Sequence, residues 1–357
     1  MLSGTGCIDK LAYSVDQLGG QRVLIATGPS LGSGPLPKQL EAILGNRWMA
    51  TFTECTQHAP SGAVQALEAA ICESRADTVV ALGGSSVTDC VKLAAWALSD
   101  QGSLDPRPYV AVPTTLSAGE FTGGAGYIDP RDGTKRTLTD SRLVAACVIL
   151  DPQMTVLTPD RLWTSTGLKA VEHAVEAIWS RYAHPLVNAH ALAAIRILSQ
   201  ALPESRPADA LGPRAACQVA AWMSIAGVSS GGLRLSHVIG HQVGAYWHIP
   251  HGITSAVLLP TVMRYLAPVT LAQQRQIAEA LGVDGSTDHD CAEGAATAIE
   301  TLTESLDLPT RLGAAGARFE DIDDVARSGF IAARALGLTG DLPRGARDIV
   351  DILGDAW

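Results

Sequence analysis

Two helical stretches carry the residues whose types and spacing could do chemistry. Lys169 lies four residues before His173 in GLKAVEHAVEA, and His237 lies four residues before His241 in LSHVIGHQVGAYW. Side chains four residues apart project from the same face of a helix. Two imidazoles at that spacing can present nitrogens to one metal ion. A lysine beside a histidine is different, because an ammonium repels a cation, so the role of Lys169 needs a separate explanation.

A third histidine motif follows the second stretch. His251 stands in IPHGI directly after Pro250, which ends any preceding helix. Neutral imidazoles bind zinc and iron, and they accept and donate protons near neutral pH. Four of the nine histidines gather around helix ends and a proline turn. This grouping favours one common site for His173, His237, His241 and His251 over four separate structural histidines.

The histidines belong to a helical half of the chain. From about residue 155 onward, Ala- and Leu-rich helical stretches follow one another and strand signals nearly vanish. The first 150 residues alternate helical stretches with short apolar runs, and we expect buried strands at 22–27, 76–82, 109–113 and 144–150. This alternation is typical of a parallel sheet covered on both faces. We expect an α/β domain over residues 1–155 and an all-α domain over 156–357, with a ligand in the cleft between them.

A glycine loop leaves the second of these strands. Gly83, Gly84, Ser85 and Ser86 follow an apolar run and precede a helical stretch. Glycines let the backbone approach an anion, and the first turn of a helix offers free N–H groups. The pattern predicts a cradle for a pyrophosphate, although a Gly-Gly-Ser turn also serves as a plain helix cap. It is not the GxGxxG fingerprint.

Two further loops follow predicted strands. Thr114, Thr115 and Ser117 place three hydroxyls at the carboxyl end of a strand, where open parallel sheets bind ligands. The run from Gly28 to Gly32 matches the GxSxG pattern of a serine nucleophile. We discount a hydrolase, because the residues after the serine, LGSGP, do not open a helix. The segment 123–138 contains two turn-rich spots and predicts a hairpin-like excursion.

The composition limits the function classes. The chain has 357 residues, of which 47% are apolar and 17% charged, and its formal net charge is −10. Because a nucleic-acid surface needs a basic stripe, we expect no nucleic-acid partner. The longest apolar run, LVAACVIL, is shorter than a membrane span, and the N-terminus lacks a signal pattern. Seven scattered cysteines without a CxxC pair are typical of reduced thiols. These features predict a cytoplasmic protein with no membrane partner; the small-molecule substrate is expected from the motifs.

Taken in order, the motifs resemble those of a known family. GGSSVTDCVK, PTTLSAGE, TGLKAVEHAVE, HVIGHQVG and PHG occur in this sequence with the order and spacing of the iron-containing alcohol dehydrogenases. Over roughly residues 20–310 the chain is most similar to the maleylacetate reductase branch. The resemblance implies a Rossmann-like α/β domain with a mostly parallel sheet and an all-α domain, the dehydroquinate synthase-like architecture. It also implies a homodimer formed through the N-terminal domain.

The resemblance assigns a nicotinamide dinucleotide to the α/β domain. It places the pyrophosphate on the glycine loop and further contacts on the hydroxyl loop, and the implied cofactor-binding residues are Gly28, Gly83, Gly84, Ser85, Ser86, Asp89, Thr114, Thr115, Ser117 and Lys135. Lys92 belongs to the same motif. An aspartate at the place of Gly28 would hydrogen-bond the ribose of NAD and repel the 2′-phosphate of NADP. With a glycine there, we expect NADP to be accepted alongside NAD.

The resemblance also implies a metal site built from one aspartate and three histidines. The histidines fall on His173, His237 and His251, the aspartate falls on Lys169, and His241 falls on a proton-relay position. In a first interpretation, Lys169 replaces the charge of iron or zinc and polarises a keto acid resembling maleylacetate while NAD(P)H delivers hydride. In a second, Glu172 replaces the missing metal ligand.

In a third interpretation, the protein has lost its redox activity. The fold has become a non-redox lyase, isomerase or cyclase, in which Lys169 and the histidines transfer protons. In a fourth interpretation, Lys169 has no catalytic role and pairs with Glu172 on a solvated helix face. A binding protein without catalysis is a further alternative, which retained ligand binding without turnover would favour.

Overall fold

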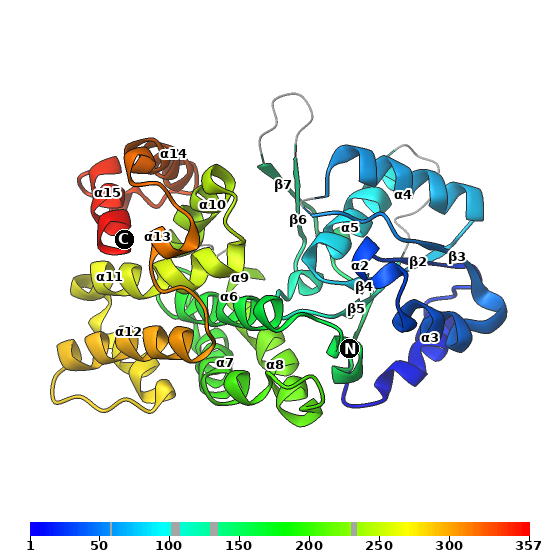
Figure 1. The fold of residues 1–357 in the computed structure, drawn as a ribbon, viewed down its shortest axis with the longest axis horizontal. Coiled ribbons are helices and arrows are strands. Elements are labelled where there is room, and N and C mark those ends of the chain that lie inside the picture. Colours follow the sequence, from blue (N-terminus) through cyan, green and yellow to red (C-terminus); the bar gives the residue numbers. More distant parts are fainter. Residues whose placement is uncertain (58, 101–107, 129–134, 230–233) are drawn as a thin grey trace. The chain divides into compact units, whose positions relative to one another are not determined.

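The computed structural model describes all of residues 1–357 except 58, 101–107, 129–134 and 230–233. The chain forms two compact units (Figure 1). One unit comprises Met1–Thr158 with Ala208–Val219, and the other comprises Pro159–Pro207 with Ala220–Trp357. Residues 208–219, which we expected in the all-α domain, therefore group with the α/β unit.

A six-stranded parallel sheet forms the centre of the first unit. The strand order is β1-β8-β5-β4-β2-β3, and every pairing in it is parallel. The strands are β1 (Leu2–Ser3), β2 (Val23–Ala26), β3 (Trp48–Phe52), β4 (Thr78–Gly83), β5 (Tyr109–Pro113) and β8 (Cys147–Leu150). The four predicted strands are confirmed. The edge strand β3 was missed, because its half-buried sequence WMATF lacks the continuous apolar run of a central strand.

Helices cover both faces of this sheet. They are α1 (Leu11–Gln17), α2 (Pro29–Gly32), α3 (Pro35–Leu44), α4 (Ser61–Ser74) and α5 (Ser85–Asp100). Alternate residues of each strand enter different cores: Leu24 packs in the cluster of α4 and α5, and Ile25 packs in the cluster of α1 and α3. Because both faces are buried, the strands are apolar throughout. The expected excursion is an antiparallel hairpin, β6 (Gly124–Ile128) with β7 (Lys135–Thr139).

The second unit is entirely helical among its described residues. Its longer helices are α6 (Asp160–Ile178), α7 (Pro185–Glu204), α10 (Leu235–Trp247), α11 (His251–Leu281), α12 (Asp288–Ser305), α14 (Ile322–Ala335) and α15 (Ala346–Asp355), and two short helices are α9 (Ala226–Ser229) and α13 (Leu312–Ala315). Helix α8 (Leu211–Ser224) begins in the α/β unit and ends in this one. The expected fold class is thus confirmed.

Helix α11 is the central helix of the helical unit. By length and composition alone it could cross a membrane, but 61% of its most apolar window is buried inside the unit. A core helix of a globular protein has the same composition. Pro268 and the non-helical backbone of Thr270 divide this helix into two segments.

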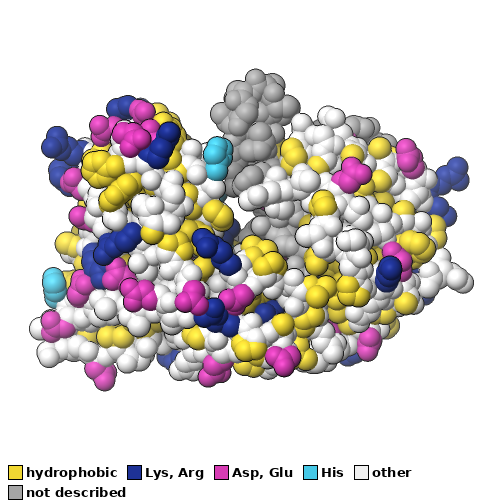
Figure 2. All heavy atoms as spheres, in the orientation of Figure 1, with side chains coloured by type: hydrophobic (Ala, Val, Ile, Leu, Met, Phe, Trp, Pro, Cys, Tyr) yellow, Lys and Arg dark blue, Asp and Glu magenta, His cyan; other side chains and the backbone are white. Residues whose placement is uncertain are grey.

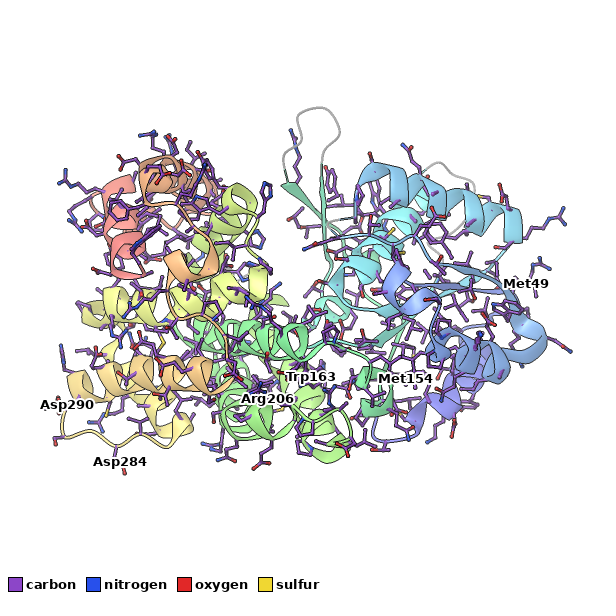
Figure 3. The ribbon with its side chains drawn as sticks, viewed as in Figure 1. Met49, Met154, Trp163, Arg206, Asp284 and Asp290 are labelled. Atoms are coloured by element: carbon purple, nitrogen blue, oxygen red, sulfur yellow. The ribbon has the colours of Figure 1, made fainter. Side chains whose placement is uncertain are left out.

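The surface and the packing are those of a globular protein. On the face drawn in Figure 2, Lys and Arg side chains are scattered among Asp and Glu and form no continuous basic stripe. Trp163, labelled in Figure 3, lies on α6 and is fully buried. Its indole N–H donates to Ser205 Oγ at 2.8 Å, so this aromatic side chain packs the core.

Candidate active site

Three helices of the second unit position the four histidines. His173 lies on α6, His237 and His241 lie on α10, and His251 is the first residue of α11. Pro250 is the N-cap of α11, and the start of this helix is in close contact with α6. A Cβ on Gly252 would lie 2.5 Å from the carbonyl oxygen of Ser165, so only glycine allows this approach.

Three of the imidazoles converge. One ring nitrogen from each of His237, His241 and His251 lies within 4.8 Å of the others. The ring centroids are 4.7 Å apart for His237 and His241, 4.6 Å for His237 and His251, and 4.4 Å for His241 and His251. The expectation of a common histidine site is therefore met by these three residues.

His173 is close to this group but not part of it. Its ring centroid lies 5.3 Å from that of His237. The side chain is buried, and its Nδ1 has no hydrogen-bond partner among the described residues. Burial lowers the pKa of His173 well below its usual 6.5, and the nearby charge of Lys169 lowers it further. His173 is therefore a neutral imidazole, and Lys169 acts electrostatically on the site.

A divalent cation could be held better by the three converging histidines than by the four residues that the resemblance implies as its ligands. Tetrahedral zinc with bonds of about 2.0–2.1 Å places its ligand nitrogens roughly 3.3 Å apart. The Nε2 atoms of His237 and His251 lie 3.3 Å apart. The set implied by the resemblance fits less well, because Lys169 brings a positive charge and His173 lies outside the converging nitrogens. His237, His241 and His251 are thus the residues that would hold a cation.

Glu172 lies behind His237. Its carboxylate accepts hydrogen bonds from Ser236 Oγ at 2.5 Å and Ser255 Oγ at 2.6 Å, and it lies 3.3 Å from His237 Nδ1. It is fully buried, and burial raises its pKa. Glu172 contacts the side of His237 away from the converging nitrogens, so the interpretation of Glu172 as a metal ligand is wrong. The solvated Lys169–Glu172 pair is also wrong, because Glu172 is not solvated.

Glu176 is a second buried carboxylate, one turn further along α6. It accepts hydrogen bonds from the backbone N–H groups of Arg234 and His237, each at 3.2 Å. Burial raises its pKa well above the usual value, and the charge of Glu172 raises it further. Through these two backbone hydrogen bonds, Glu176 fixes the start of α10 and with it His237. The sequence contained this residue in the histidine motif but gave it no role.

The glycine and hydroxyl loops meet in the α/β unit. Thr114 N–H donates to the carbonyl of Gly83 at 3.0 Å, and a Cβ on Gly84 would lie 3.0 Å from the side chain of Thr115. Thr115 Oγ1 and Ser117 Oγ are 3.1 Å apart. The partly exposed residues Gly84, Ser85 and Ser86 form the start of α5. The loops thus form a cradle with free helix N–H groups, which fits a pyrophosphate.

Gly28 stands at the same edge of the sheet, directly after β2. It is the N-cap of α2, and an added Cβ would lie 3.0 Å from the carbonyl oxygen of Cys55. The neighbouring hydroxyl of Thr27 is fully buried without a hydrogen-bond partner among the described residues. Sequence analysis did not single out Thr27, since a lone threonine at a strand end carries no signal. An unpaired polar atom beside the glycine loops fits a site for a polar ligand.

Asp89 and Lys92 support the backbone next to the loops. Asp89 accepts a hydrogen bond from Gly126 N–H at 3.3 Å. Lys92 is fully buried and donates to the carbonyls of Gly119, Thr122 and Gly124, each at 2.7 Å. Both residues thus hold the segment that follows the hydroxyl loop. Lys135, expected near the ribose, begins β7, and its side chain lies outside the described part of the structure.

Two family models match this chain, and known proteins are similar to most of its length. The model of the family described as iron-containing alcohol dehydrogenase matches residues 1–152, and that of the C-terminal part of the Fe-containing alcohol dehydrogenase family matches residues 163–357. The chain is 29% identical over 322 residues to a maleylacetate reductase from Burkholderia cepacia, covering 90% of this chain and 86% of that protein. It is 27% identical over 344 residues to the NAD-dependent methanol dehydrogenase of Bacillus methanolicus, covering 92% and 90%.

Solved structures give the same result. The crystal structure of maleylacetate reductase from Rhizobium sp. matches this chain with a TM-score of 0.85 at 27% identity, and the match covers 100% of this chain and 95% of that one.

Proposed function

The chain belongs to the iron-containing alcohol dehydrogenase family of NAD(P)-dependent oxidoreductases, and from that premise we propose that it reduces a small keto acid resembling maleylacetate. In this proposal, NAD(P)H binds to the α/β unit, and the histidines and Lys169 bind the substrate. Lys169 supplies positive charge at the position where the family has a metal-binding aspartate. The observation that carries the proposal is the position of Lys169 on α6, one turn before the buried His173, whose ring lies beside that of His237.

The loops of the α/β unit support a dinucleotide. A pyrophosphate would lie against Gly83 and Gly84, where side chains are absent and helix N–H groups are free. The unpaired hydroxyl of Thr27 and the hydroxyls of Thr115 and Ser117 would supply hydrogen bonds. Gly28 carries no carboxylate to repel a 2′-phosphate, so we propose that NADPH is used at least as well as NADH.

The charges in the helical unit support an anionic substrate. The ammonium of Lys169, which is only partly exposed, attracts a carboxylate. It also stabilises negative charge on a carbonyl oxygen as that charge develops. A keto acid offers both groups, whereas a simple alcohol or aldehyde offers no carboxylate. Lys169 thus favours the substrate class of the maleylacetate reductases over that of the methanol dehydrogenase.

The reaction balances with the groups at hand. Hydride leaves C4 of the nicotinamide and bonds to the electrophilic carbon of the substrate, and NAD(P)H becomes NAD(P)⁺. The π electrons of the polarised bond move towards the carbonyl oxygen, whose negative charge Lys169 stabilises. A proton from His241 or water completes the product. A cation held by His237, His241 and His251 would supply further polarisation of that oxygen.

Two general properties belong to the same proposal. Its small-molecule chemistry and free cysteines fit the cytoplasm. A homodimer formed through the α/β unit, as the resemblance implies, would give one active site to each subunit.

Titration of the purified protein with NADPH and then NADH tests the cofactor part first. Nicotinamide fluorescence should change with micromolar affinity, at least as tightly for NADPH as for NADH. Turnover is then measured with a series of oxo acids and matched aldehydes, and oxo acids should be preferred. Absence of binding by either nucleotide would overturn the reductase proposal. It would favour the non-redox alternative, in which Lys169 and the histidines catalyse proton transfer.

A further inference from the structure

The hydrogen bonds around Glu172 determine how His237 carries its proton. Ser236 and Ser255 lie 2.5 and 2.6 Å from the two carboxylate oxygens. Distances of about 2.5–2.7 Å are typical of a hydroxyl that donates to an ionised carboxylate. Each serine has one hydroxyl hydrogen, and these short contacts take it. Glu172 is therefore an acceptor towards all its neighbours.

His237 must then donate to Glu172. Its Nδ1 lies 3.3 Å from Glu172 Oε2, and an ionised carboxylate has no hydrogen to offer. Nδ1 thus carries the hydrogen. A neutral imidazole has only one N–H, so the Nε2 atom of His237 is left with a lone pair.

The lone pair faces the other histidines. Nε2 of His251 lies 3.3 Å from Nε2 of His237, so in the metal-free protein His251 must donate its Nε2–H. The remaining Nδ1 of His251 faces Thr254 Oγ1 at 3.2 Å. The hydrogen bonds therefore run in one direction, from His251 through His237 to Glu172. A cation shared by the histidines would need the same lone pair on His237.

We propose that Glu172 is a positioning residue that holds His237 in its Nδ1–H tautomer and directs its Nε2 lone pair into the histidine group. Glu172 acts from α6 on a residue of α10, and Ser255 of α11 fixes the carboxylate from the third side. Carboxylates behind histidines fix ring orientation and tautomer in many active sites. Glu172 touches neither cofactor nor substrate in this assignment. Only the kinetic part of the proposal rests on the proposed function.

Ring ¹⁵N spectroscopy of the full-length protein tests the assignment directly. Protein labelled with ¹⁵N-histidine is freed of metal with a chelator and measured at about pH 8, where imidazoles are ordinarily neutral. Comparison with His237→Gln identifies the His237 signals. The wild-type protein should show a hydrogen on Nδ1 and none on Nε2 of His237. Because this measurement needs no variant of Glu172, it decides the tautomer even if such variants fail to fold.

Three variants then test the role of the carboxylate. Glu172→Ala removes the acceptor and should give a mixture of tautomers, whereas Glu172→Gln should recover much of the Nδ1–H form, because an amide oxygen also accepts. Glu176→Gln is the matched control: this buried carboxylate of the same helix contacts His237 only through its backbone N–H. It should leave the tautomer unchanged.

The kinetic readout separates this proposal from the reductase proposal. Loss of a carboxylate behind a histidine typically lowers activity by about 10–100-fold. For Glu172→Ala we expect this loss in kcat, with little change in the KM for NADPH and partial rescue by glutamine. A wild-type His237 that carries its hydrogen on Nε2, or an unchanged tautomer in Glu172→Ala, would overturn the assignment. The expected tautomer without NADPH-dependent turnover would instead overturn the reductase proposal alone.

Discussion

At the scale of single residues, one charge distinguishes this site from the ligand set that the resemblance implies. Lys169 brings positive charge where that set has a carboxylate; this charge lowers the pKa of His173 and opposes the rise in the pKa of Glu172. Three imidazoles nevertheless keep a geometry that accepts a cation. Glu172 provides a buried carboxylate on the same helix, but it faces the back of His237. Helix α6 thus places one cationic group, the ammonium of Lys169, and one buried carboxylate, that of Glu172, near the histidines.

Replacement of Lys169 tests whether its charge is catalytic. We expect Lys169→Ala and Lys169→Met to lower turnover by roughly tenfold or more, which corresponds to about 1.4 kcal/mol of lost transition-state stabilisation. Methionine keeps most of the aliphatic length, so an equal loss in both variants assigns the effect to charge. Initial rates are measured with excess NADPH in the presence of a chelator. An unchanged rate in Lys169→Met would show that the ammonium has no part in catalysis.

At the scale of elements, one buried lysine organises the segment between the hydroxyl loop and the β6–β7 hairpin. Lys92 extends from α5 and donates to three carbonyls of residues 119–124. These carbonyls belong to a 3₁₀ turn at Gly119–Phe121 and to the start of β6. Burial lowers the pKa of Lys92 to about 8. The segment after the hydroxyl loop therefore depends on this contact for its shape.

Removal of the Lys92 ammonium should destabilise the α/β unit. Lys92→Met keeps the buried chain but removes a donor from three carbonyls, of which that of Gly119 still accepts from Thr122 N–H. Each buried group left unsatisfied costs about 1–3 kcal/mol. Relaxation and water entry reduce the sum, so we expect a loss of roughly 3 kcal/mol in the free energy of unfolding. Denaturant unfolding measures this loss. Lys38→Met, which changes an exposed lysine of α3, should alter stability by no more than about 0.5 kcal/mol.

At the scale of the whole molecule, the two units have different cores and contribute different chemistry. The α/β unit buries both faces of a parallel sheet, whereas the helical unit is built around α11. Each unit also buries ionisable groups that make folding depend on pH. In the α/β unit, burial raises the pKa of Glu120 from its usual 4.5 to about 7, while the charge of Lys92 opposes this rise.

Glu120 should therefore make the protein less stable as pH rises. A carboxyl with a raised pKa holds its proton longer in the folded state, so its stabilising contribution is complete below about pH 4.5 and is lost as pH rises through about 7. Glu120→Gln keeps the shape but cannot ionise. Urea unfolding between about pH 5 and about pH 8 should show the wild-type protein losing stability relative to the variant. A constant difference across this range would contradict the shifted pKa.

The sequence by itself determined four of the six strands of the sheet, the two kinds of domain and the identity of the histidine motifs, because these follow from local periodicity and short spacings. Through the resemblance, it also marked Lys169 as a departure from the implied ligand set. Only the tertiary structure decided which nitrogens converge: His241 joins His237 and His251, and His173 lies beside them. It also decided the place of Glu172, which a helical wheel puts next to His173 but which contacts residues of α10 and α11. These outcomes depend on how three helices distant in the sequence pack against one another, and that packing cannot be obtained from the period of any one of them.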